Sequence, residues 1–242
     1  MSLINAEVFF DKLINGKYYS RALSDSHRLP DGFTLTYHAG ALRTKPNTVE
    51  SIEAALADGA SVVEFDVSFR PDGTAVIIHA DKPKENEGVL LDDALAAVAK
   101  DKNCRINLDI KSTANLPQVD ILVKKHGLFE RVFYTGVFRD WVEAVKANSE
   151  IPYYLNHKVS AEEAANATLL QKLAEEIIGL GAIGLNSNFS NANATVTEVM
   201  HKNGLLVSLW TVNGSKNAAK VISYLPDNIT TKKPHLIKNM IK

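Results

Sequence analysis

The hydrophobic positions along the chain fall into short runs that alternate with longer, helically spaced patterns. Eight runs rich in β-branched and aromatic residues indicate strands. They span 33–38, 61–67, 74–79, 105–110, 131–135, 151–155, 182–185 and 205–210. Apolar residues recurring every three or four positions predict helices. These cover 91–100, 116–126, 141–147, 161–180, 192–203 and 215–225.

Two further helices are predicted near the start of the chain. Asn47 and Glu50 have the spacing of a capping box, in which Asn47 accepts from first-turn amides and Glu50 reaches back. Gly59 is the expected stop of that helix. Residues 6–23 form a helical pattern that precedes the first strand.

Alternating strands and helices favour a parallel α/β sheet, and eight strands without a linker predict a closed barrel. We therefore expect a distorted TIM (β/α)₈ barrel over 33–242, preceded by an N-terminal helical extension over 1–32. The connection over 68–73 is too short for a parallel crossover, and its Asp72-Gly73 pair is a hairpin signal. Either a helix is missing there or the flanking strands are locally antiparallel.

The composition of the chain argues against several classes of function. Twenty-seven basic and 28 acidic residues give a net charge of -1, which removes the usual electrostatic case for nucleic-acid binding. No apolar run approaches the roughly 18 residues of a membrane span. Cys104 is the one cysteine, which excludes an intrachain disulfide and a cysteine-rich zinc site. Without a convincing signal peptide, the expected compartment is the reducing cytoplasm. The sequence does not set the oligomeric state.

Carboxylates gather on one face of two predicted strands. Glu64 and Asp66 project together because residues two apart on a strand share a face, and Asp109 and Lys111 do the same on the fourth strand. The intervening aliphatic residues should pack under the helices, so the carboxylates should face the barrel mouth. Two forms of compensation are open: a divalent cation, Mg²⁺ or Ca²⁺, or a salt-bridge network with Lys111.

Two histidines end predicted strands, His38 the first and His79 the third. The carboxyl ends of barrel strands form the active face, and a histidine pair can supply one base and one acid. A tight hairpin at Asp72-Gly73 would place His79 beside Asp66. Trp210, on the last predicted strand, is either a core residue or an apolar wall for a substrate.

These residues together resemble the glycerophosphodiester phosphodiesterase family. The resemblance rests on the order and spacing of short motifs, densest over 36–112. The motifs are Tyr37-His38-Ala39-Gly40, Pro46-Asn47-Thr48, Gly59-Ala60, Val63-Glu64-Phe65-Asp66-Val67, Pro71-Asp72-Gly73, Val76-Ile77-Ile78-His79, Asn107-Leu108-Asp109-Ile110-Lys111 and Trp210-Thr211-Val212-Asn213.

The resemblance implies hydrolysis of a small-molecule glycerophosphodiester to glycerol 3-phosphate and an alcohol. It implies acid/base roles for His38 and His79, and a divalent cation, Mg²⁺ or Ca²⁺, as cofactor. It also implies that the cation is bound by Glu64, Asp66 and Asp109, that Lys111 contacts phosphate and that Trp210 lines the substrate pocket.

The chain departs from the family pattern at several positions. Ala39 stands where the family usually has an arginine that grips phosphate, and Arg43 or Lys45 in the same loop is the candidate replacement. Asp109 is one methylene shorter than the usual glutamate. The insertion that follows the family's second histidine is reduced here to 80–104.

Two other functions stay open. A related phosphodiesterase would act on a lysophospholipid or a phosphoinositol head group, although the polar loop over 82–88 offers no apolar platform for lipid. A non-catalytic barrel would bind phosphoesters without turnover.

Overall fold

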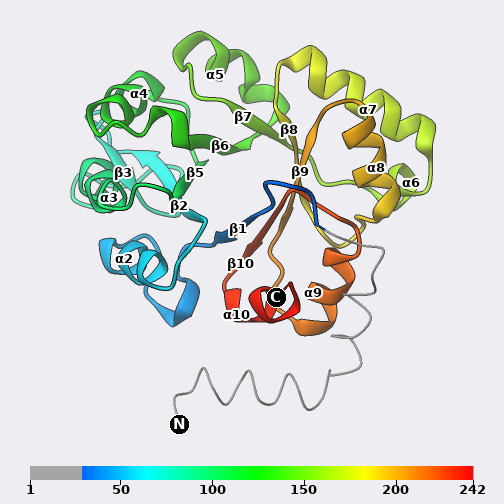
Figure 1. Ribbon diagram of the computed structural model, residues 1–242. Helices are drawn as coiled ribbons and strands as arrows, with labels where there is room; N and C mark the ends of the chain where they lie inside the picture. The colour runs from blue at the N-terminus through cyan, green and yellow to red at the C-terminus, as the bar shows by residue number, and fades with distance from the viewer. Residues whose placement is uncertain (1–28, 242) are drawn as a thin grey trace.

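A computed structural model describes residues 29–241, and it is a barrel of parallel strands surrounded by helices (Figure 1). The helix predicted over 6–23 lies outside the described residues. Eight strands form the closed parallel ring, because the last of them pairs with the first. In ring order they are β1 (Thr34–Tyr37), β2 (Val62–Phe69), β5 (Arg105–Ile110), β6 (Val132–Val137), β7 (Tyr153–Asn156), β8 (Gly184–Asn188), β9 (Leu206–Trp210) and β10 (Asn228–Thr231). The predicted TIM-type barrel is confirmed.

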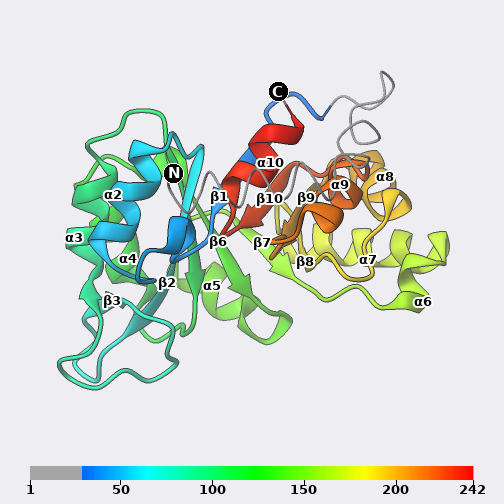
Figure 2. The same ribbon diagram turned by 90° about the horizontal axis from the view of Figure 1, so that it is seen from below.

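At least one helix follows each ring strand along the chain and packs outside the ring (Figures 1 and 2). These helices are α2 (Val49–Ala57), α3 (Leu91–Val98), α4 (Leu116–Lys125), α5 (Val142–Asn148), α6 (Ala161–Ala164), α7 (Ala167–Leu180), α8 (Ala194–Lys202), α9 (Ser215–Ile222) and α10 (Pro234–Met240). Short 3₁₀ turns are η1 (Ala41–Arg43), η2 (Phe129–Arg131) and η3 (Arg139–Trp141). Within residues 29–241, every helix is too short or too polar to cross a bilayer.

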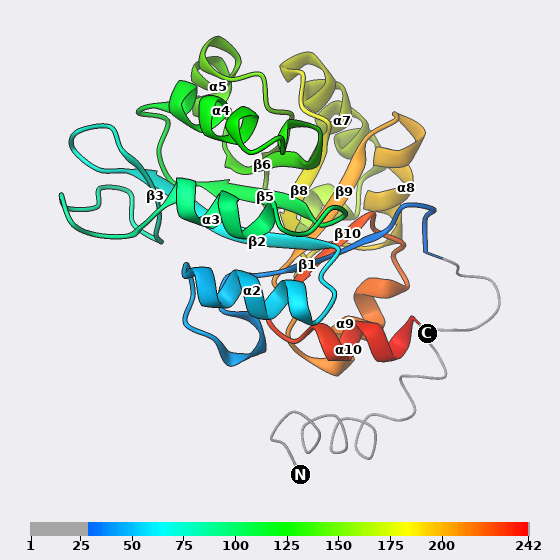
Figure 3. The same ribbon diagram turned by 60° about the vertical axis from the view of Figure 1, so that its left-hand side comes forward.

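The segment predicted as the third barrel strand lies outside the ring. Its central part, β3 (Ala75–Ile77), pairs antiparallel with β2 and with β4 (Val89–Leu90), and this small hairpin projects beside the barrel (Figure 3). Of the two alternatives for the 68–73 connection, the antiparallel pair is therefore the one observed. The expectation that 74–79 forms a barrel strand is wrong, because its apolar alternation sets a strand but not the strand's partner.

The eighth barrel strand is β10, which the hydrophobic pattern does not reveal. Three of its four residues are polar, yet all four are buried. The Asn228 side chain accepts hydrogen bonds from Thr34 and Thr36 and donates one to Ser208. A strand whose inward residues are satisfied by such bonds needs no apolar signature on that face.

The barrel interior changes in character from one end to the other. Val62, Phe133 and Tyr154 form a small apolar cluster near the amino ends of their strands, with the two rings edge to face. Further along, amide and hydroxyl side chains pair, as Asn186 does with Asn156. The charged residues of β2 and β5 lie closest to the carboxyl ends of the strands. The barrel interior is therefore polar at its mouth, and the apolar cluster fills the other end.

Candidate active site

A cavity of about 450 Å³ opens at the carboxyl ends of the barrel strands. It brings together side chains that are distant in sequence but were predicted to act together. Those predicted from sequence are His38, Glu64, Asp66, His79, Asp109, Lys111 and Trp210. Arg43, one candidate replacement for the family arginine, is exposed in the connection after β1 and is not part of the cavity lining.

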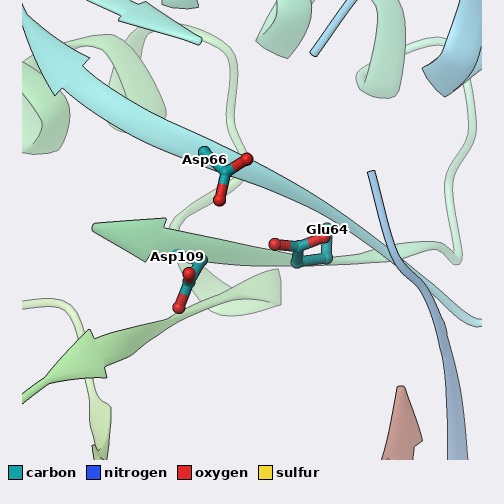
Figure 4. Close-up of side chains that lie close together, drawn as sticks. All are labelled: Glu64, Asp66 and Asp109. Carbon is teal, nitrogen blue, oxygen red and sulfur yellow. The ribbon is translucent and has the colours of Figure 1, made fainter. Parts of the chain in front are cut away.

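Three carboxylates meet on the cavity floor (Figure 4). Glu64 and Asp66 extend from β2, and Asp109 extends from the neighbouring strand β5, directly beside Asp66 in register. One oxygen from each lies within 4.8 Å of the others. The intervening Phe65 and Leu108 are buried in the main apolar core, as expected from the alternation along each strand.

Among the three acids, Glu64 is the one whose negative charge is least compensated. It is 6% exposed, and burial followed by the charges of Asp66 and Asp109 raises its pKa well above the ordinary value. The Ala39 amide donates to its Oε2 at 2.6 Å, and His38 Nδ1 lies 3.7 Å away. Within residues 29–241 no lysine or arginine forms an ion pair with it.

Lys111 compensates the other two acids. Its ammonium contacts Asp66 Oδ1 at 2.9 Å and also contacts Asp109. Burial would raise the pKa of Asp66, but the Lys111 charge and then Asn47 bring it below its ordinary value. Burial likewise opposes the charge on Lys111, yet the two carboxylates raise its pKa. The salt-bridge alternative therefore describes Asp66 and Asp109 but leaves Glu64 without a cation.

Asn47 has a different role from the predicted one. Thr48, not Asn47, is the N-cap of α2, and its hydroxyl accepts from the Ser51 amide. Asn47 instead donates from Nδ2 to Asp66 Oδ2 at 2.7 Å and accepts from the Asp66 amide at 3.0 Å. Its φ of 56° is left-handed, a conformation that asparagine tolerates better than most residues. Asn47 thus fixes the orientation of one of the three acids.

Each histidine lies beside one of the two β2 carboxylates, His38 beside Glu64 and His79 beside Asp66. His38 Nδ1 is 3.0 Å from the Ala39 carbonyl, and burial followed by the charge of Lys232 lowers the pKa of the ring. His79 Nδ1 is 3.2 Å from Asp66 Oδ1, and its side chain is 75% exposed. The antiparallel β2–β3 pair brings His79 to Asp66, as a tight hairpin predicts.

This donor set fits a hard divalent cation. Carboxylate oxygens are the preferred ligands of Mg²⁺ and Ca²⁺, at about 2.0–2.6 Å from the ion. Three oxygens within 4.8 Å of one another can therefore surround one such ion. The raised pKa of Glu64 marks the deficit of positive charge that a cation would correct.

The other wall of the cavity is aromatic, and sequence reasoning missed most of it. Phe138 and Trp141, which follow β6, line the cavity together with Trp210. The rings of Phe138 and Trp141 pack edge to face, with their centroids 6.1 Å apart. Phe138 is 53% exposed, so it presents apolar surface at the rim. Asp81, also missed, lines the cavity after His79. A single signal was available for Phe138: it directly follows a strand end, where barrel sites are built.

Comparisons with known proteins agree with this geometry. Residues 38–85 match the model of the glycerophosphoryl diester phosphodiesterase family. A glycerophosphodiester phosphodiesterase of Caldanaerobacter subterraneus is 23% identical, over 85% of this chain and 96% of the relative. In sequence the chain is thus similar to the glycerophosphodiester phosphodiesterase family. The family match spans His38, Glu64, Asp66 and His79, so it includes both histidines and two of the three acids.

Solved structures of the family share the fold. A phosphodiesterase of Oleispira antarctica, in complex with the product sn-glycerol-3-phosphate, superposes with a TM-score of 0.69 at 19% identity, over 88% of this chain and 97% of that one. A glycerophosphodiester phosphodiesterase of Parabacteroides distasonis gives 0.67 at 18% identity, over 86% and 97%. Glycerophosphodiester phosphodiesterases thus share this barrel at low sequence identity.

Proposed function

We propose that the chain is a phosphoric diester hydrolase that converts glycerophosphodiesters to sn-glycerol 3-phosphate and an alcohol. The observation that carries the proposal is the convergence of Glu64, Asp66 and Asp109 with two histidines in one cavity. The product named in the Oleispira structure supports the same substrate class. A cavity of about 450 Å³ suits a small molecule.

Glu64, Asp66 and Asp109 are the proposed ligands of a divalent cation, Mg²⁺ or Ca²⁺. Such an ion would offset negative charge on a phosphate oxygen and lower the pKa of a hydroxyl bound to it. Lys111 holds Asp66 and Asp109 in place and puts a positive charge at the floor. Asn47 orients Asp66 through both of its side-chain hydrogen bonds.

The histidines are the proposed proton carriers. A His38 ring that donates from Nδ1–H to the Ala39 carbonyl leaves Nε2 as the acceptor, so we assign proton abstraction from the attacking oxygen to His38. The attacking oxygen bonds to phosphorus as the bond between phosphorus and the alcohol oxygen breaks, and His79, held beside Asp66, gives its proton to the departing alcohol oxygen. The attacking oxygen belongs either to water or to the neighbouring glycerol hydroxyl; the second route needs a later hydrolysis of the cyclic phosphate.

Mutation of either histidine tests these roles. Hydrolysis of glycerophosphocholine and glycerophosphoethanolamine is followed by enzymatic detection of sn-glycerol 3-phosphate, with Mg²⁺ or Ca²⁺. His38→Gln and His79→Gln should each lower kcat/KM by roughly 10²–10⁴-fold. His201→Gln is the control, because His201 lies in the last turn of α8, which runs from the carboxyl end of β8 back to the opposite end of the barrel. Wild-type protein without turnover in either metal, or variants as active as the control, would reject the proposal.

A lysophospholipid is a second candidate substrate because of one observation. The exposed Phe138 and its partner Trp141 supply, at the rim, the apolar surface that the 82–88 loop lacks. The same assay with lysophosphatidylcholine, read out as released choline, separates the two substrates. A higher kcat/KM for the lipid would make it the preferred class.

A further inference from the structure

Lys232 lies beside His38, one of the residues that line the cavity, and no carboxylate of residues 29–241 pairs with its ammonium. It follows β10 directly, and β10 lies beside β1 (Figure 1). The two strands pair in parallel, with Tyr37 opposite Thr231. The His38 amide donates to the Thr231 carbonyl at 3.0 Å, which continues this register by one step. Neighbouring strands are about 4.8 Å apart, so the Lys232 backbone lies about one strand spacing from that of His38.

The alternation along the two strands directs both side chains to the same side. Thr36 and Asn228 bond each other inside the barrel, and His38 and Thr230 line the cavity. Lys232 is the next residue on the inward face of β10, two positions after Thr230. The charge of Lys232 also affects the pKa of His38 more than the charge of either Asp66 or Asp109 does.

The backbone of Lys232 is held from both sides. Its amide donates to Asn213 Oδ1 at 2.8 Å, and its carbonyl accepts from the Leu42 amide at 3.3 Å. Asn213 lies beyond β9, and Leu42 lies in the connection after β1. The loops on either side of β10 therefore fix where the lysine side chain starts, while the side chain itself is exposed.

The charges around the cavity create a need for this lysine. Glu64, Asp66, Asp109 and Asp81 line the cavity, and Lys111 is the one lysine among the lining residues. Lys111 is committed to Asp66 and Asp109. With a divalent cation bound and His79 protonated as proposed, the charges of the ionised cavity only balance, so no positive charge is left over to attract an anionic phosphodiester. Within residues 29–241, no carboxylate lies within ion-pair distance of the Lys232 ammonium.

We propose that Lys232 is a phosphate-binding residue that holds the substrate's phosphate oxygens at the mouth, with β1 and β2 lying between β10 and β5, the strand that Lys111 follows. This inference rests on the proposed phosphodiester substrate, and it assigns to β10 a role that Ala39 cannot perform. A lysine ammonium suits this position because it is a compact charge on a flexible stem that can follow the phosphate as it turns from diester to monoester.

Two measurements on Lys232→Gln test the proposal. Steady-state kinetics with glycerophosphocholine should show KM raised roughly ten- to hundredfold, the range for one lost charge-assisted hydrogen bond, with kcat little changed. Calorimetric titration with sn-glycerol 3-phosphate should show a similar loss of affinity without any need for turnover. Lys232→Arg should restore most of both.

The matched control is Lys202→Gln, which removes an exposed lysine at the other end of the barrel. Lys232→Gln with KM and product affinity within twofold of this control would overturn the proposal. Wild-type protein that binds sn-glycerol 3-phosphate through Lys232 but does not turn over would support this inference and reject the proposed hydrolase. Wild-type protein that neither binds nor turns over would reject both.

Discussion

Glu64 offers a test in which stability and cation binding should move in opposite directions. Its carboxylate is buried against two other acids, and within residues 29–241 no lysine or arginine forms an ion pair with it, although the charge of Lys111 acts on it from a greater distance. Glu64→Gln removes this charge while keeping the size of the side chain and an oxygen that can accept from the Ala39 amide. We expect the metal-free protein to become more stable and to lose much of its response to Mg²⁺ or Ca²⁺.

The pH dependence follows from the direction of the pKa shift. Unfolded Glu64 releases its proton near the ordinary pKa of 4.5, whereas the folded protein retains it to higher pH. In that interval the unfolded state binds fewer protons, so stability falls as pH rises, by about 1.4 kcal/mol per pH unit. The loss is absent below the unfolded pKa and stops growing above the folded pKa. Because glutamine does not ionise, Glu64→Gln does not undergo this loss of stability at any pH.

Thermal unfolding makes these energies measurable. For a domain of this size, each kcal/mol moves Tm by roughly 2–4 °C. In EDTA, Glu64→Gln should therefore melt several degrees above wild type at pH 8, and the difference should shrink at pH 5. A cation at about 100 times its Kd stabilises its binding state by about 2.7 kcal/mol, or roughly 5–10 °C for wild type. The variant should show less than half of that shift.

Glu53→Gln is the matched control, because Glu53 is exposed and pairs with Lys100 on the surface. It removes the same charge and should change Tm by little in either condition. The reasoning would be refuted if Glu64→Gln melted below wild type in EDTA at pH 8. An undiminished cation shift in the variant would show that Glu64 is not a ligand.

Three further substitutions probe the supports of the site. Asn47→Gly keeps the left-handed backbone accessible but deletes both hydrogen bonds to Asp66. Cation affinity should therefore fall roughly 10–100-fold in a competition titration with a fluorescent chelator. Unchanged affinity would show that Asn47 does not support the site. Lys111→Met leaves Asp66 and Asp109 unpaired and should cost about 3 kcal/mol in urea unfolding with EDTA; an unchanged midpoint and slope would argue against the ion pairs. Gly136→Ala places a Cβ 3.0 Å from Asp109 Oδ1 and closer still to the Ile110 carbonyl, whereas Gly59→Ala has the same positive φ and open space. The first should lose about 1–3 kcal/mol more than the second in thermal unfolding; equal losses would mean that the contact is relaxed.

The sequence predicts strands well where the barrel wall separates two environments. On β2 and β5, aliphatic residues face the helices and acids face the mouth, so spacing alone placed Glu64 and Asp66 together. The same logic failed for β10, because its inward residues are polar and only Ile229 has an aliphatic side chain. A strand inside a polar mouth carries little hydrophobic contrast to detect.

Which strands and side chains contact one another was harder to predict than where the strands begin and end. The run over 74–79 has strand composition, but the connection over 68–73 is too short for a parallel crossover, so the run pairs antiparallel with β2 outside the ring. Asn47 fits the spacing of a capping box, but in the structure Thr48 is the N-cap of α2. Asn47 instead donates a hydrogen bond to Asp66, 19 positions further along the chain. Phe138 and Trp141 join the cavity only because the ring closes, so their aromatic character alone did not mark them.

Closure of the ring by β10 also has a consequence for how the protein is made. The bonds from Thr34 to Asn228 join residues 194 positions apart, and such non-local pairing is slow to form. A growing chain cannot complete the barrel until residue 231 has left the ribosome, whatever helices have formed before. His38 gains its neighbour Lys232 at that same late step. The cavity mouth is therefore incomplete in a nascent chain until residues 228–232 are free to pair with β1.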